Sequence, residues 1–159
     1  MVKEGQKAPE FELPSAEGGQ VALKDHRGKP VVLYFYPKDD TPGCTREACA
    51  FRDAQAQIRK TGAVVLGVSP DSVASHERFK GKYKLNFPLL SDADKTVAKK
   101  YGAYGEKTMY GKKVVGMIRS TFIIDGAGVV GKVFPRVKVD GHAEQVLRAL
   151  QELRGRTEA

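Results

Sequence analysis

The sequence lacks the features of several specialised classes of protein. It has no apolar run near the roughly 20 residues that a membrane-spanning helix needs. Its first seven residues lack the apolar stretch of a secretory signal, so we expect a cytoplasmic protein. Internal repeats and low-complexity linkers are also missing. A length of 159 residues therefore favours one domain, residues 1–159, with enough chain to bury a sizeable core.

Cysteine is scarce, since the chain contains only two. Two cysteines are too few for a disulfide scaffold, and a chain of this size does not need one. Cys44 and Cys49 lie five residues apart. In a reducing compartment such a close pair is more often catalytic or metal-binding than structural.

The chain is basic, with 27 lysines and arginines against 19 acidic residues and a net charge of +8. This charge raises nucleic acids and membrane surfaces as partners. The lysines are scattered, however, with short pairs at Lys99-Lys100 and Lys112-Lys113, and aromatic residues do not interleave with them. Neither a zinc-finger spacing nor an RNA-binding signature is present. We expect a solvated basic surface, with no nucleic-acid or membrane partner.

Apolar runs and turn residues predict strands that alternate with helices. Strands are expected at residues 8–14, 18–23, 31–36, 63–69, 87–91, 119–125 and 129–134, and helices at 42–62, 70–83, 91–102 and 142–153. A capping box at Ser91–Asp94 begins the third helix. Residues 103–117 are expected to be loop with some strand. This order predicts an α/β fold, with a central mixed sheet flanked by helices and an N-terminal β-hairpin.

Both cysteines belong to the segment from Pro37 to Cys49, between a buried strand and a helix. Thr41-Pro42 is a plausible N-cap followed by proline at the first helical position. Cys44 then falls in the first helical turn, where free backbone N–H groups and the helix dipole favour an anion. The βαβ order places it at the carboxyl end of a central strand, where open α/β sheets carry their sites.

A reactive thiol here requires a nearby cation as well as the helix. A free thiol with a pKa near 8.5 is only about 3% thiolate at pH 7, and the thiolate is the nucleophile. Lowering that pKa by two needs about 2.7 kcal/mol, whereas a helix N-terminus supplies at most about 2 kcal/mol. By residue type alone, Arg46, Arg52 and Arg119 are equally eligible cations.

Cys49 cannot form a disulfide with Cys44 while the helix is intact. Positions i and i+5 of a helix have Cα atoms roughly 8–9 Å apart and point about 140° away from each other. A disulfide needs about 4.4–6.8 Å between these atoms. A bond between the two cysteines therefore requires the start of the helix to unwind.

Two other motifs are rejected on their context. The glycines of residues 126–131 match a dinucleotide-binding pattern, but a strand and a proline follow where that pattern needs a helix, so we expect a hairpin turn. A zinc site would need both cysteines and two of His26, His76 and His142, but the histidines are too far apart in the sequence for the C-x2–4-C…H-x3–5-H pattern. Each histidine is expected on the surface or at a helix cap.

The segment from Tyr34 to Asp53 closely resembles the peroxiredoxins, in particular the bacterioferritin comigratory protein, or Q-type, subfamily. The family's Pro-x-x-x-Thr-x-x-Cys motif is complete as Pro37, Thr41 and Cys44. Residues 5–11 and 119–125 match as well, and the resemblance covers nearly the whole chain. It implies a thioredoxin-like fold and a thiol peroxidase that uses no metal, haem or flavin.

The resemblance also implies roles for single residues. Cys44 would be the peroxidatic cysteine, and Cys49 would resolve its sulfenic acid as an intramolecular disulfide that thioredoxin or a similar dithiol reduces. Arg119 would be the active-site arginine, and Thr41 would help hold hydrogen peroxide or an organic hydroperoxide. Pro37 would pack the loop and shield the thiolate from water. The resemblance favours a monomer.

Two alternatives stay open from the residues. A general thiol-disulfide oxidoreductase would also use two cysteines, although the i, i+5 spacing disfavours fast exchange in a folded helix. A basic nucleic-acid-binding or holdase protein would explain the net charge, and salt-dependent DNA binding would favour it.

Overall fold

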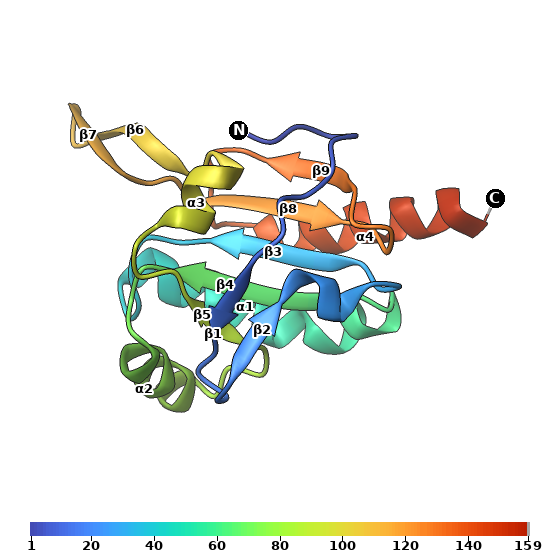
Figure 1. Cartoon of the computed structure of the whole chain (residues 1–159). Helices are drawn as coiled ribbons and strands as arrows, with labels where there is room; N and C mark the ends of the chain where they lie inside the picture. The colour runs from blue at the N-terminus through green and yellow to red at the C-terminus, as the bar shows by residue number, and fades with distance from the viewer. Residues whose placement is uncertain (159) are drawn as a thin grey trace.

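The computed structural model describes the backbone of residues 1–158 and the side chains of residues 1–154, and it is built on a five-stranded mixed sheet. The strand order is β5-β4-β3-β8-β9 (Figure 1). The strands are β3 (Val31–Phe35), β4 (Val64–Ser69), β5 (Leu89–Ser91), β8 (Ser120–Ile124) and β9 (Val130–Phe134). β3, β4 and β5 run parallel, while β8 and β9 are antiparallel to their neighbours. The predicted α/β class and central mixed sheet are confirmed.

β3 is the central strand because it is apolar on both faces. All five of its residues are buried. It pairs in parallel with β4 and antiparallel with β8, so helices or loops must cover both of its faces. This agrees with the unbroken apolar run of residues 31–36.

Helices α1 (Pro42–Lys60) and α4 (His142–Glu158) pack against each other on one face of the sheet (Figure 1). Phe51 and Ile58 of α1 and Val146 and Leu150 of α4 are buried in the same apolar cluster. Helix α2 (Val73–Tyr83) contacts the edge strand β5 and adds Phe79 to this cluster. The predicted helices are confirmed, with α4 longer than expected.

The N-terminal segment and helix α3 (Thr96–Tyr101) cover the opposite face of the sheet (Figure 1). The N-terminal segment forms the hairpin of β1 (Glu12–Pro14) and β2 (Gln20–Ala22), followed by the short 3-10 helix η1 (Leu23–His26). Phe11 and Tyr101 pack edge to face, with ring centroids 6.3 Å apart. The expected N-terminal hairpin is confirmed, with shorter strands.

Residues 103–117 form more regular structure than we expected. β6 (Tyr104–Met109) and β7 (Lys112–Met117) make a complete antiparallel hairpin that projects from the body of the protein (Figure 1). Its two-residue turn has positive φ at both Tyr110 (53°) and Gly111 (78°). Turns of this kind suit the right-handed twist of a hairpin, but they normally carry asparagine or glycine at the first position. The tyrosine hid the turn from sequence analysis.

The capping box predicted at Ser91–Asp94 is wrong. Ser91 ends β5, and α3 begins later, at Thr96, with Lys95 at the N-cap position. The Asp92 carboxylate still serves the helix start, because it accepts hydrogen bonds from the backbone N–H groups of Val97 (3.3 Å) and Ala98 (2.9 Å). The helix ends at Gly102, as predicted.

Gly126 and Gly128 lie in the turn that connects β8 to β9 in an antiparallel hairpin, and Gly131 is part of β9. The Asp125 carboxylate accepts the backbone N–H of Ala127 at 2.9 Å and closes the turn. The rejection of a dinucleotide site there is supported, because a strand follows the glycines. No helix of the described part of the chain is long and apolar enough to cross a bilayer.

Candidate active site

Cys44 lies in the first turn of α1, directly after the loop that leaves β3. Thr41 has the extended N-cap conformation (φ −97°, ψ 155°), and Pro42 is the first helical residue. The proline ring favours this start because its fixed φ suits a helix and its missing N–H would have no helical partner there. Cys44 is only 2% exposed. The predicted strand-loop-helix position of this cysteine is confirmed.

Arg119 reaches Cys44 because of the pairing between β3 and β8. Phe35, the last residue of β3, pairs with Ser120, so Arg119 lies beside the carboxyl end of β3. Its Nη2 donates to Cys44 Sγ at 3.3 Å. This contact stabilises negative charge on the sulfur.

The other two eligible arginines lie elsewhere. Arg46 is exposed and forms an ion pair with Asp140 at 2.7 Å. Arg52 donates to Asp53 at 3.0 Å and to the carbonyl of Tyr83 at 2.6 Å. Sequence reasoning left the three cations equal, and the structure brings only Arg119 of the three to Cys44.

Glu47 is a member of the site that sequence analysis missed. Its carboxylate is 1% exposed, and Oε1 accepts from Arg119 Nη1 at 2.7 Å. Burial raises its pKa from 4.5 to about 7, although the charge and hydrogen bond of Arg119 oppose the shift. Among the described residues Glu47 Oε2 has no hydrogen-bond partner. The spacing of three residues from Cys44 could have identified Glu47, since i and i+3 share a helix face.

Arg119 stays charged despite its partial burial. Desolvation opposes the charge, but Glu47 and Cys44 outweigh it and raise the pKa of the guanidinium above its usual range. Each of its two terminal nitrogens therefore holds one acidic partner, the carboxylate on one side and the sulfur on the other. This arrangement fixes the orientation of the guanidinium.

Gly43 leaves room for that guanidinium. A Cβ atom at this position would lie 3.2 Å from Arg119 Nη2, which is tighter than ordinary contact. A side chain on residue 43 would therefore push the guanidinium by a few tenths of an ångström from its position beside Cys44. The glycine before the cysteine serves the approach of Arg119 rather than a turn.

Thr41 and Pro37 are both in the loop between β3 and α1, and both are half-buried. Thr41 occupies the N-cap position, but its side chain does not cap the helix. Instead, Thr41 Oγ1 donates to the carbonyl of Lys38 at 2.8 Å. The lone pairs of this hydroxyl remain able to accept a hydrogen bond from a ligand.

Cys49 is half-buried on the same continuous helix, and both cysteines are free thiols. Because α1 is intact from Pro42 to Lys60, the two residues are separated by the helix geometry, with Cα atoms roughly 8–9 Å apart. The structure therefore represents the reduced, folded state. A Cys44–Cys49 disulfide requires the first turns of α1 to unwind.

A buried polar network anchors the loop beneath the site. The Asp39 carboxylate accepts from Tyr36 Oη (2.6 Å) and Ser75 Oγ (2.8 Å), and His76 Nδ1 lies 2.6 Å from it. The other ring nitrogen of His76 lies 2.9 Å from the carbonyl of Leu90. The network ties the loop of residues 37–41 to α2 and β5.

The histidines were expected at the surface or at caps, and this is wrong for two of them. His76 is fully buried in the Asp39 network, and His142 is 2% exposed. His142 Nε2 lies 2.8 Å from Thr121 Oγ1, and burial lowers the pKa of its ring. Within the described residues, no three histidine, cysteine or acidic side chains come close enough together to hold a metal ion.

Sequence comparison places these residues in a known family. Residues 4–133 match the AhpC/TSA family. The match contains the strand, loop and helix that carry Cys44, and also Arg119. The chain belongs to the AhpC/TSA family of peroxiredoxins.

Close relatives of this peroxiredoxin span almost the same length. A protein of Coxiella burnetii named as a Bcp peroxiredoxin is 56% identical over 149 residues, covering 94% of this chain and 99% of the relative. Peroxiredoxin Bcp of Escherichia coli K12 is 44% identical over 151 residues, covering 95% of this chain and 97% of the relative. The resemblance to the bacterioferritin comigratory, or Q-type, peroxiredoxins is confirmed.

Solved structures of the same subfamily share the fold. The bacterioferritin comigratory protein of Xanthomonas campestris, studied for alkyl peroxide reduction, superimposes with a TM-score of 0.86 at 44% identity, over 91% of this chain and 92% of that one. BcpB of Mycobacterium tuberculosis gives a TM-score of 0.85 at 36% identity, over 96% and 98% of the two chains. The peroxiredoxin has the predicted thioredoxin-like fold, and its activity is that of a thiol peroxidase.

Proposed function

We propose that this peroxiredoxin reduces hydrogen peroxide and organic hydroperoxides through a cycle on Cys44 and Cys49, with thioredoxin or a similar dithiol protein as reductant. The observation that carries the proposal is the hydrogen bond from Arg119 Nη2 to Cys44 Sγ in the first turn of α1. It joins a nucleophile, a fixed cation and free helix N–H groups at one point.

In the first step the Cys44 thiolate attacks one oxygen of the peroxide. The S–O bond forms as the O–O bond breaks, and the leaving oxygen takes a proton and departs as water or an alcohol. Sulfur loses two electrons and the peroxide gains two, which leaves a sulfenic acid on Cys44. Arg119 stabilises the negative charge that moves from sulfur to the leaving oxygen.

Thr41 supports this step as an acceptor. Its hydroxyl hydrogen is engaged with the carbonyl of Lys38, so its oxygen is oriented to accept a hydrogen bond from the peroxide. The backbone N–H of Cys44 donates to the same peroxide. Pro37, half-buried in the preceding loop, restricts the access of water to the sulfur.

In the second step Cys49 resolves the sulfenic acid. After the first turns of α1 unwind, the Cys49 thiolate attacks the sulfur of Cys44. The S–S bond forms as the S–O bond breaks, and the leaving hydroxide takes a proton and departs as water. A reduced dithiol protein then returns two electrons and two protons, and its own cysteines become a disulfide. This reduction completes the cycle and restores the two free thiols of the structure.

The test follows peroxide consumption by the full-length protein with thioredoxin and its reductase. The native protein should consume peroxide, and Cys44→Ser should be inactive. Cys49→Ser should still form the sulfenic acid but lose turnover with thioredoxin. Peroxide turnover that survives in Cys44→Ser would overturn the proposal, and insulin reduction in the absence of peroxide would favour a general oxidoreductase instead.

Location, assembly and further partners stay predictions. We propose a cytoplasmic monomer that binds neither nucleic acid nor membrane, since resolution within one chain needs no second copy. Size-exclusion chromatography with light scattering tests the monomer. Binding to DNA that persists at physiological ionic strength would contradict the absence of a nucleic-acid partner.

A further inference from the structure

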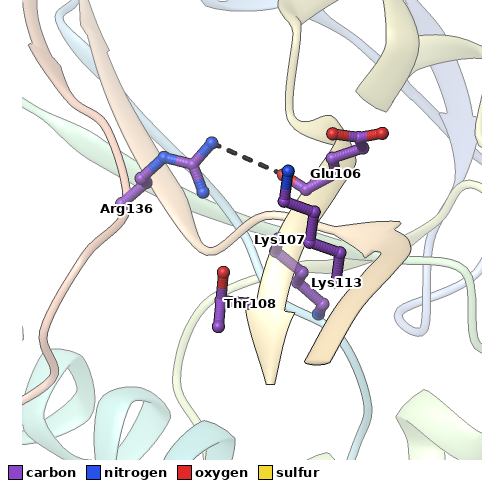
Figure 2. Close-up of a pocket in the computed structure, with 5 residues that line it drawn as sticks. All are labelled: Glu106, Lys107, Thr108, Lys113 and Arg136. Carbon is purple, nitrogen blue, oxygen red and sulfur yellow. Dashed lines mark hydrogen bonds between the residues drawn. The ribbon is translucent and has the colours of Figure 1, made fainter. Parts of the chain in front are cut away.

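A basic cavity of about 610 Å³ lies against the hairpin of β6 and β7 (Figure 2). Its lining consists of Glu106, Lys107, Thr108, Lys113 and Arg136. We call it the hairpin cavity. Three cationic side chains and one carboxylate give it a net charge of +2, and sequence reasoning assigned none of these residues to a site.

The cations of the hairpin cavity are not neutralised by the protein. Among the described residues, none of Lys107, Lys113 and Arg136 forms an ion pair with a carboxylate. Arg136 Nη2 donates to the backbone carbonyl of Glu106 at 3.4 Å, as Figure 2 shows. Lys107 Nζ donates to the carbonyl of Met117 at 2.5 Å. Lys107 and Arg136 are therefore hydrogen-bonded to neutral carbonyl groups, which position the side chains but do not neutralise their charge.

Two of the chain segments that line the hairpin cavity lead to Arg119. β7 ends at Met117, two residues before Arg119, and the loop that carries Arg136 is bonded to Arg119 through Val137 N–H and the Arg119 carbonyl at 2.8 Å. The pKa of Lys107 is lowered by its partial burial and by the charge of Arg119, while Cys44 opposes the shift. Lys107 is therefore close enough to respond to the charges at the reacting sulfur.

We propose that the hairpin cavity binds the anionic group, a carboxylate or a phosphate, of an organic hydroperoxide whose peroxide group reaches Cys44. The proposal rests on the proposed peroxidase function and adds a substrate class to it. Arg136 and Lys113 are the principal contacts for the anion, because guanidinium and ammonium groups bind such oxygens by charge-assisted hydrogen bonds. Thr108 adds a hydroxyl donor.

The hairpin cavity would select the substrate and would take no part in the reaction at Cys44. Lys113 and Arg136 come from β7 and from the loop after β9, and neither touches Cys44. They should therefore affect the affinity for anionic peroxides and leave the chemistry of neutral peroxides unchanged. Higher ionic strength should weaken the preference for anionic peroxides, since the side chains of Lys113 and Arg136 are both exposed.

The test compares two peroxides with the same reacting centre, cumene hydroperoxide and its para-carboxylate derivative. The full-length reduced protein should reduce the carboxylate derivative with the lower KM. The double variant Lys113→Gln/Arg136→Gln should lose about tenfold in kcat/KM for the carboxylate at low salt, mainly through KM, because each exposed charge contributes a few-fold. Its kinetics with cumene hydroperoxide should be unchanged.

The matched control is Lys112→Gln, which removes the same charge from the neighbouring residue of β7. Lys112 is not among the residues that line the cavity, and its side chain lies on the opposite face of β7 from that of Lys113. This variant should leave both peroxides unaffected. The para-phosphate derivative gives the second arm: the anion with the greater loss in the double variant identifies the natural group.

Three results would overturn the proposal. They are an equal loss for both peroxides, an equal loss in Lys112→Gln, and a changed KM for thioredoxin in place of the peroxide, which would make the cavity a docking site for the reductant. If the native protein reduced neither peroxide at Cys44, the peroxidase function itself would fail. A fourth contradicting result, reduction of both peroxides with identical kinetics in every variant, would remove only the role of the hairpin cavity.

Discussion

Glu47 Oε1 accepts a hydrogen bond from Arg119 Nη1 at 2.7 Å inside the protein, where the carboxylate is 1% exposed. The two residues are 72 positions apart in the chain, and the guanidinium that joins them also contacts Cys44. The orientation of the cation at the sulfur therefore depends on a buried acid. This dependence can be measured by kinetics and by stability.

Replacing Arg119 should slow peroxide reduction without preventing it. Arg119→Met removes the donor at Cys44 Sγ and should lower kcat/KM for peroxide by about 100-fold. Because it also leaves Glu47 buried without its partner, the double variant Arg119→Met/Glu47→Gln separates lost catalysis from lost stability. Stopped-flow oxidation of Cys44 measures the rate.

The control for this variant is Arg46→Met, which removes the same charge from an exposed position on α1. Peroxide should oxidise Cys44 of this variant at the native rate. If Arg46→Met were slowed as much as Arg119→Met, the general positive field of the protein rather than the direct contact would be responsible.

The buried acid should make stability depend on pH. Because the pKa of Glu47 is about 7 when folded against 4.5 ordinarily, the folded state holds the proton more tightly. This stabilisation, about 3 kcal/mol, is complete below pH 4.5 and is lost as the pH rises through 7. Glu47→Gln should remove this part of the pH dependence. The check is the free energy of unfolding by urea at several pH values, with exposed Glu144→Gln as control. If the free energy of unfolding changed with pH in Glu47→Gln as it does in the native protein, Glu47 would not be the group responsible.

The stability of the first turns of α1 should set the rate of disulfide formation. Arg46→Ala and Arg46→Gly both remove the ion pair with Asp140, but glycine lowers helix stability by about 1 kcal/mol relative to alanine. If unwinding limits resolution, the glycine variant should form the disulfide up to about fivefold faster and over-oxidise less. Quenched-flow trapping of free thiols gives the rates. Equal rates in the two variants would show that unwinding is not limiting.

The buried Asp39 network should be essential for stability. Asp39→Ala leaves Tyr36, Ser75 and His76 without their shared acceptor and should cost about 3 kcal/mol. The neighbouring Asp40 has a positive φ of 56°, which asparagine tolerates, so Asp40→Asn removes only the exposed ion pair with Lys82 and its effect should be much smaller. Thermal unfolding followed by circular dichroism compares the two. Equal losses in both variants would mean that the network does not anchor the loop.

The position of Cys44 was predictable because every determinant is local. An apolar strand, the Thr41-Pro42 helix start and the cysteine lie within 14 residues, and each has a known conformational preference. The identity of the cation was not predictable from the residues, because the pairing of β3 with β8 decides it. Only the family resemblance selected Arg119.

The missed features depend on contacts between distant segments. From the sequence, His76 resembles a surface residue of an amphipathic helix. In the fold it is buried because Asp39 and Leu90, from other elements, pack against it and bind its ring nitrogens. The β6–β7 hairpin was missed because Tyr110 occupies a turn position that usually carries asparagine or glycine. The late start of α3 depends on the Asp92 carboxylate, which reaches five and six residues ahead.

The central claim is that Cys44 is oxidised first and that Cys49 resolves it within the same chain. Mass spectrometry of the full-length protein after one equivalent of hydrogen peroxide tests it most directly. We expect the loss of two hydrogens, with peptides containing Cys44 and Cys49 joined in a single chain. A product that gains oxygen on Cys49, or a disulfide that links two chains, would contradict the account.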